Sequence, residues 1–224
     1  MAYYLLPHHS QRRHRTERLG NLSIICGGFI LSLLVSTSGL CAQSTTLEDE
    51  NYYFRAGVGY PIVDYSSAII AEIDVIKSEG GHRDLLAYLD IGLYWPKFSR
   101  SHLIGVAVTG FFDTYKGDGW TSTMNFAQIG PSMQFFLTPG IGDGPYLRLD
   151  PGMVMQWSDT EISTDDGTLR FQTRQNVGFG LLAGCGYAIP ISAGTRLTID
   201  ASYTLRNTGD WDATTLQFGA GMLW

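Results

Sequence analysis

Charged residues recur in a fixed phase along otherwise uncharged, alternating segments of this chain. The set comprises five arginines and four aspartates: Arg55, Asp84, Asp90, Arg148, Asp150, Arg174, Arg196, Asp200 and Arg206. If the face that carries them is enclosed, these charges should pair, because an unpaired buried charge is very costly. We expect pairs between neighbouring strands, with Arg148 or Arg174 against Asp150 and with Arg196 or Arg206 against Asp200.

The two histidines beyond residue 42 are the candidates for catalysis. His82 lies between Ser78 and Asp84 in the sequence, and His102 directly follows Ser101. A general base must come within hydrogen-bond reach of its nucleophile, and neither spacing is typical of a hydrolase motif. The sequence therefore favours interfacial polar residues over catalytic ones, and we expect no catalytic residue.

Acidic residues near position 160 are the candidates for metal binding. Asp159, Glu161, Asp165 and Asp166 supply oxygen ligands, but without the ordered spacing of a calcium-binding loop. A solvated loop is the simpler interpretation, although acidic residues gathered at one surface could bind divalent cations. We expect neither a specific metal site nor a cofactor.

Eight segments alternate between apolar residues and small or polar ones. They run at about 52–60, 83–95, 102–113, 124–137, 146–157, 171–187, 195–206 and 216–224. Alternation with a period of two predicts β-strands with one apolar face. A soluble sandwich or barrel would alternate too, but here the polar face holds Gly, Ser, Thr, Gln and Asn, with no lysine or glutamate. Such a face suits a crowded interior better than a surface in water.

The apolar face and the connections indicate a membrane. None of the charges named above interrupts the apolar face, as expected if it touches lipid, where an arginine at the midplane costs roughly 2–4 kcal/mol. Short links at about 96–101, 138–145 and 188–194 alternate with mostly longer ones at about 61–82, 114–123, 158–170 and 207–212. Eight strands closed into a barrel leave no free edge and satisfy every backbone group.

Aromatic residues bracket the apolar band in two groups. One group falls at the predicted periplasmic ends: Tyr52, Tyr53, Tyr94, Trp95, Phe98, Tyr187 and Trp224. The other falls near the opposite rim: Phe111, Phe112, Tyr115, Trp120, Trp157 and Trp211. Two aromatic girdles around an apolar belt are typical of outer-membrane barrels.

The first 42 residues have the features of a secretory signal peptide. Arginines precede an uncharged, apolar run, and the small residues around Ala42 offer a cleavage site. The alternative is a retained membrane anchor, because about 20 apolar residues can span a bilayer. We therefore expect a signal peptide over 1–42, a short periplasmic segment over 43–50 and a barrel domain over 51–224.

With these features together, the chain resembles the small eight-stranded outer-membrane barrels of the OmpA/OmpX type. The resemblance covers 51–224 and includes the ending "LQFGAGMLW", in which Leu216, Phe218, Ala220, Met222 and Trp224 share one face. That ending is similar to the family's C-terminal signal for the barrel-insertion machinery. The resemblance implies an all-β, antiparallel, up-and-down transmembrane barrel in the outer membrane of a Gram-negative-type bacterium.

The resemblance also implies partners, which are outer-membrane lipid and lipopolysaccharide, and the insertion machinery during assembly. We expect the protein to be a monomer. No basic cluster occurs after the first eighteen residues, so a nucleic-acid partner has no support. Because an eight-stranded barrel has room only for side chains or one small ligand, the sequence favours a salt-bridged lumen and a structural or surface-interaction role. A narrow channel or a conduit for small hydrophobic ligands is the first alternative, and a lipid A-modifying enzyme is the second.

One segment departs from the strand pattern. Residues 66–77, "SSAIIAEIDVIK", fit a helical stripe of isoleucines or a strand equally well. The segment could form a capping helix, a protruding hairpin or an extra strand. An extra membrane strand would invalidate the even strand count.

Overall fold

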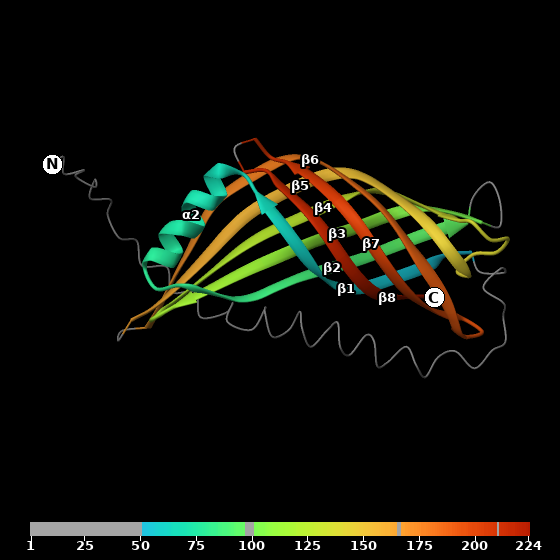
Figure 1. Cartoon of the computed structure of the whole chain (residues 1–224), viewed down its shortest axis with the longest axis horizontal. Helices are drawn as coiled ribbons and strands as arrows, with labels where there is room; N and C mark the ends of the chain where they lie inside the picture. Colours follow the sequence, from blue (N-terminus) through green and yellow to red (C-terminus); the bar gives the residue numbers. More distant parts are fainter. Residues whose placement is uncertain (1–50, 97–100, 165–166, 210) are drawn as a thin grey trace. The chain divides into compact units, whose positions relative to one another are not determined.

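Eight antiparallel strands form a closed barrel in the computed structural model, which describes residues 51–96, 101–164, 167–209 and 211–224. In chain order the elements are β1 (Tyr53–Tyr65), α2 (Ser67–Ser78), β2 (His82–Pro96), β3 (His102–Gly117), β4 (Trp120–Phe136), β5 (Gly144–Thr164), β6 (Gly167–Ser192), β7 (Thr195–Asn207) and β8 (Ala213–Leu223). Each strand pairs with the next, and β8 pairs with β1 (Figure 1). The predicted all-β, eight-stranded, antiparallel up-and-down barrel is confirmed. The predicted segments 1–42 and 43–50 lie outside the described residues.

Alternation along each strand separates an apolar outer face from a polar inner face. Every strand exposes large apolar side chains, for example Val58, Ile91, Val106, Ile129, Leu149, Phe179, Ile199 and Phe218. Polar side chains between them are buried, including Thr109, Gln128, Thr204 and Gln217. A water-soluble barrel would bury the apolar face instead.

Five of the aromatic residues assigned to the girdles are buried inside the barrel instead. Tyr53, Tyr94, Phe111 and Tyr115 share the inward phase of their strands and are at most 2% exposed, and Trp211, which follows β7, is 7% exposed. The prediction that they bracket the outer face is wrong for these five. Inward glycines provide the space for such rings: a Cβ on Gly186 would lie 2.5 Å from the ring of Tyr146.

The strands extend farther at one end of the barrel than at the other, and different elements connect them at the two ends. At the turn end, strands join through short links such as the turn between β6 and β7. At the helix end, β3 to β6 continue well beyond the predicted strands, so most of the predicted loops at 114–123 and 158–170 are paired strand. Both faces of these extensions carry polar residues, so the alternation that marks a strand is lost there.

At the helix end, β1 and β2 separate, and α2 occupies that side. Their pairing ends at Gly59 and Tyr88, whereas β1 continues along β8 as far as Tyr65. α2 runs from the end of β1 towards the beginning of β2 (Figure 1). Ile69, Ile73 and Ile76 form the buried stripe of this helix, as their spacing allows.

Of the three interpretations for 66–77, the helix is therefore the observed one. It adds no strand to the barrel, so the even count holds. Within the described part of the chain, no helix is both long enough and apolar enough to cross a membrane.

Candidate functional site

Five charged side chains form a cluster inside the barrel, between its middle and the turn end. We call Arg55, Asp90, Arg148, Asp150 and Asp200 the charged cluster. Arg148 Nη1 and Nη2 donate to Asp90 Oδ2 at 2.5 Å and Oδ1 at 2.9 Å, and Arg148 Nε donates to Asp150 Oδ2 at 2.8 Å. Arg148 is thus held by two carboxylates, one from β2 and one from its own strand.

Arg55 extends this cluster to a third carboxylate. Its Nε donates to Asp90 Oδ2 at 2.7 Å and its Nη2 to Asp200 Oδ2 at 2.5 Å. Asp200 lies on β7, two strands away from Arg55 on β1, with β8 between them. Inward positions of β8 at this level are Gly219 and Gly221, so no side chain from β8 separates the two partners.

Hydroxyl and amide groups supply further hydrogen bonds to the charged cluster. Arg55 Nη1 donates to the phenol oxygen of Tyr146 at 2.9 Å. Ser132 Oγ donates to Asp150 Oδ1 at 2.5 Å and lies 3.0 Å from the phenol oxygen of Tyr94. Charges that are buried this deeply are tolerated only when their polar atoms are paired in this way.

Apolar side chains close the lumen on the turn-end side of the charged cluster. They are Tyr53, Tyr94, Leu103, Phe136, Ile141, Tyr146, Ala188 and Leu223. All are at most 5% exposed. Together with the charged cluster they fill this half of the lumen.

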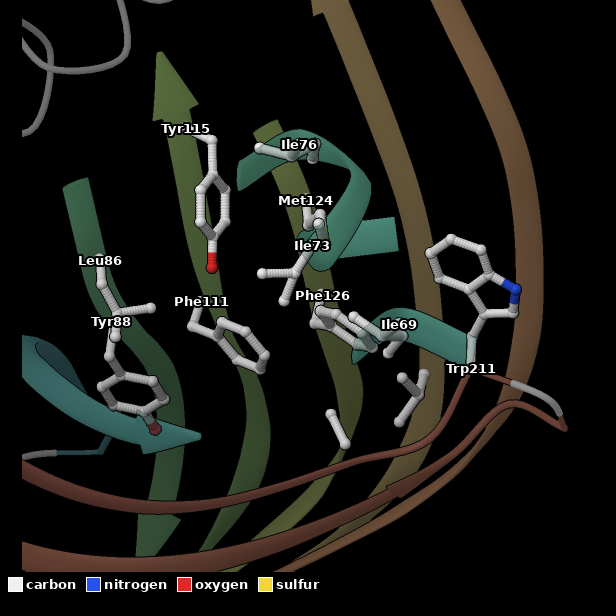
Figure 2. Packing of buried hydrophobic residues seen from close by; sticks show 12 residues of the cluster. Ile69, Ile73, Ile76, Leu86, Tyr88, Phe111, Tyr115, Met124, Phe126 and Trp211 are labelled. Carbon is white, nitrogen blue, oxygen red and sulfur yellow. The ribbon is translucent and has the colours of Figure 1, made fainter. Parts of the chain in front are cut away.

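A larger apolar cluster fills the helix-end half. It comprises Ile69, Ile73, Ile76, Leu86, Tyr88, Phe111, Tyr115, Met124, Phe126, Val154, Trp211 and Ala213, and Figure 2 shows the isoleucines of α2 directed at the aromatic rings of the barrel wall. Phe111 and Phe126 stack with their centroids 4.8 Å apart. α2 therefore serves as a lid whose inner face is part of the core of the barrel.

Arg206 lies beside the large apolar cluster. Its guanidinium is 5.2 Å from the ring centroid of Phe111, on the opposite wall, and Nη1 donates to Thr215 Oγ1 at 2.9 Å. Nε and Nη2 have no hydrogen-bond partner among the described residues, although the side chain is only 2% exposed. Arg206 is thus the least satisfied of the described lumen arginines.

A further ion pair, which simple alternation did not predict, lies at the mouth of the barrel. Arg83 Nε and Nη2 donate to the two carboxylate oxygens of Asp113 at 2.9 Å, and the Tyr65 hydroxyl donates to Asp113 Oδ2 at 2.7 Å. The register of β2 shifts between Arg83 and Leu85. This irregularity brings Arg83 into the inward phase, which simple alternation assigns to Asp84.

The remaining predicted lumen charges lie elsewhere. Asp84 is exposed and pairs with Lys116 at 2.7 Å, so its predicted place in the lumen is not observed. Arg196 caps the turn after β6 by donating to the carbonyls of Ser192 and Thr195. The side chain of Arg174 lies outside the described residues.

The predicted pairings are met only in part. Arg148 pairs with Asp150 as expected. The partner of Asp200 is Arg55, whereas the sequence pointed to Arg196 or Arg206. For Asp200 the expectation of a partner on a neighbouring strand was wrong, because the inward glycines of β8 let β1 and β7 pair across it.

The two candidate catalytic histidines lie in different surroundings. His82 begins β2 and is exposed. His102 Nδ1 lies 3.1 Å from Ser101 Oγ, and its ring contacts the edge of Phe135. Within the described residues, no cluster of three or more His, Cys, Asp and Glu residues is arranged to hold a metal ion.

The final strand completes the outer face. Leu216, Phe218 and Ala220 point outward from β8, and Met222 and Trp224 continue the same phase. Trp224 exchanges two backbone hydrogen bonds with Phe54. The rings of the two residues pack in a T-shaped arrangement, with their centroids 5.2 Å apart. The last residues of the chain therefore take part in closing β8 onto β1.

Comparison with solved structures bears on this arrangement. Ail, the attachment invasion locus protein of Yersinia pestis, solved with the heparin analogue sucrose octasulfate, is 13% identical, with 78% of this chain and all of Ail covered at a TM-score of 0.50. The chain has the fold of the small eight-stranded outer-membrane barrels. The N-terminal barrel domain of Pseudomonas aeruginosa OprF is 12% identical, with 78% and 98% of the two chains covered at a TM-score of 0.41.

Neisserial surface protein A is 16% identical, with 77% and 96% of the two chains covered at a TM-score of 0.44. No protein-family model matches the sequence, and no curated protein matches it. At identities this low the likeness concerns the fold alone.

Proposed function

We propose that this protein is a closed, non-catalytic barrel of the outer membrane of a Gram-negative-type bacterium, with a structural or surface-interaction role. The observation that carries the proposal is the filled lumen. Two apolar clusters and the charged cluster between them occupy successive levels of the interior. A barrel of eight strands has little further room for a permeant solute.

The outer face supports a place in the membrane. Large apolar side chains are exposed on all eight strands, and a closed barrel satisfies its backbone groups without water. The short links would face the periplasm and the helix end the exterior, as in other outer-membrane barrels. Outer-membrane lipid and lipopolysaccharide are then its surroundings, and the insertion machinery is its partner during assembly.

Charge at the helix end bears on the surface role. Acidic residues outnumber basic ones in the connections and strand ends there, and Lys116 and Arg170 are already paired with Asp84 and Glu161. A surface of this sign would repel a polyanion such as the one bound to Ail. It favours a cationic partner, or divalent cations that bridge to lipopolysaccharide phosphates.

Planar-bilayer recordings test the closed lumen. The purified monomer should produce no discrete conductance steps at moderate voltage. Arg148→Ala, which opens the centre of the charged cluster, is the matched comparison, with Arg170→Ala at the exposed hairpin as its control. Regular steps from the unaltered protein that change in Arg148→Ala, but not in Arg170→Ala, would establish the narrow channel instead.

The lipid A-modifying alternative has a separate test. Turnover of labelled lipid A by membranes that contain the barrel, and its loss in His82→Ala or His102→Ala, would overturn the non-catalytic role. We expect no turnover above that of membranes lacking the protein.

A further inference from the structure

Arg206 presents an open hydrogen-bonding edge inside the barrel. One face of the guanidinium lies on Phe111, and Nη1 is used by Thr215. Nε and Nη2, which lie on the same edge of the group, have no acceptor among the described residues. A carboxylate binds to such an edge with two parallel hydrogen bonds.

None of the described carboxylates fills this edge. Asp90, Asp150 and Asp200 pair with Arg55 and Arg148, and Asp113 pairs with Arg83. The charged cluster has one more carboxylate than guanidinium, so it balances the charge of Arg206 at a distance. It supplies no acceptor to Nε or Nη2, and buried donors without acceptors are costly.

Apolar side chains cover the helix-end side of Arg206. Phe111, which contacts the guanidinium, stacks on Phe126 in the large apolar cluster. Ile69 and Ile73 of α2 pack in the same cluster (Figure 2). A ligand with its anion on Arg206 would therefore place the rest of its mass among apolar side chains.

We propose that Arg206 and the large apolar cluster form a binding site for a single-chain aliphatic carboxylate. The carboxylate accepts hydrogen bonds from Nε and Nη2, and the alkyl chain takes the place of the α2 isoleucines beneath a displaced helix. This goes beyond the closed-barrel role, because it holds whether or not the lumen conducts.

α2 and the separated strands provide the entry. Pairing between β1 and β2 ends at Gly59 and Tyr88, so on this side α2, rather than a backbone ladder, covers the lumen. Its buried face consists of three isoleucines, whose removal from the cluster is offset by burial of the alkyl chain. An alkane without a polar head group would lack the hydrogen bonds to Arg206, and a small anion would lack the burial of an alkyl chain.

Titration of the folded barrel in phospholipid nanodiscs with [1-13C]dodecanoate tests the proposal, with empty nanodiscs as the baseline. Heat-modifiable migration on a gel first confirms that each variant is folded. We expect saturable binding to the unaltered protein, and an affinity at least about tenfold lower in Arg206→Gln, because two charge-assisted hydrogen bonds are lost. Arg196→Gln, at the solvent-facing turn, is the matched control and should bind as the unaltered protein does.

Dodecanol lacks the carboxylate and acetate lacks the long alkyl chain, so the two ligands test the two parts of the site separately. Both should bind at least about tenfold more weakly than dodecanoate. Equal affinity of Arg206→Gln, or dodecanol binding as tightly as dodecanoate, would overturn the proposal. Acetate binding as tightly would show an adventitious anion only. If Arg206→Gln does not fold, NMR contacts between the methylene chain and Phe111 or Ile73 decide, and their absence overturns the site.

Discussion

At the scale of single residues, the lumen is organised by arginines that each hold more than one partner. Arg148 bridges Asp90 and Asp150, and Arg55 bridges Asp90 and Asp200. Sharing Asp90 joins four strands, β1, β2, β5 and β7, through one connected set of ion pairs. In an interior of low dielectric such a set is stable only while it is complete.

Replacing Arg148 with glutamine should therefore be severely destabilising. Asp150 loses its only ion-pair partner among the described residues and Asp90 loses one of two, which should lower the free energy of unfolding by about 3–5 kcal/mol. Urea unfolding in lipid vesicles measures it. Arg170→Gln, at an exposed pair with Glu161, should change stability by less than about 1 kcal/mol; similar losses in both variants would contradict the role of the charged cluster.

At the scale of elements, α2 and β8 have different roles in closing the molecule. α2 is amphipathic and covers the side where β1 and β2 separate. β8 has an apolar outer face and two inward glycines, and it pairs with both β7 and β1. The helix closes the lumen, whereas the strand closes the barrel.

Ile73→Ser should loosen α2 without unfolding the barrel. The substitution removes a buried side chain, 5% exposed, from the large apolar cluster and should cost the packing of the helix about 2–4 kcal/mol. Faster tryptic cleavage after Lys77, with the strands still protected, is the expected readout. Ile70→Ser, on the exposed face of the same helix, should leave the cleavage rate unchanged, and equal rates in both variants would count against the lid.

Deletion of Trp224 should impair assembly more than the loss of another outward aromatic does. Trp224 pairs with Phe54 through two backbone hydrogen bonds, so its loss affects closure as well as the predicted insertion signal. The fraction of heat-modifiable, folded protein in cell envelopes measures this. Trp95→Ala removes an exposed aromatic side chain within β2 and is the control; normal insertion of the truncated chain would refute the signal.

At the scale of the whole molecule, polarity is arranged in two directions. Around the barrel axis, apolar side chains face outward and polar ones inward. Along the axis, a charged cluster lies between two apolar clusters. The first arrangement suits a lipid environment, and the second supports the closed lumen that we propose.

This arrangement predicts how the protein should fractionate. It should be recovered with outer membranes, require detergent for extraction and shift in apparent mass when boiled before electrophoresis, because a closed barrel resists unfolding by detergent alone. Sucrose-gradient fractionation and paired boiled and unboiled lanes measure both properties. Recovery as a soluble periplasmic monomer without detergent would end the membrane assignment.

Much of the fold follows from local pattern. The number of strands, their outward faces and the inward phase of Arg55, Arg148 and Arg206 could be read from alternation, because in a strand each residue's face is set by its parity. Strand ends beyond the apolar band could not, since both faces meet polar surroundings there. The irregularity next to Arg83 reverses the phase, so Asp84 was assigned to the lumen in its place.

The sequence by itself thus determined that this chain forms an eight-stranded barrel with an apolar outside and a charged inside, because lipid and lumen impose opposite demands on alternate residues. Only the tertiary structure decided which charges meet. Arg55 reaches Asp200 across the glycines of β8, and Arg206 lies on Phe111 with Nε and Nη2 unpaired among the described residues. These contacts of Arg55 and Arg206 join residues far apart in the chain. They depend on the stagger of the strands in the closed barrel, which cannot be predicted from local sequence pattern.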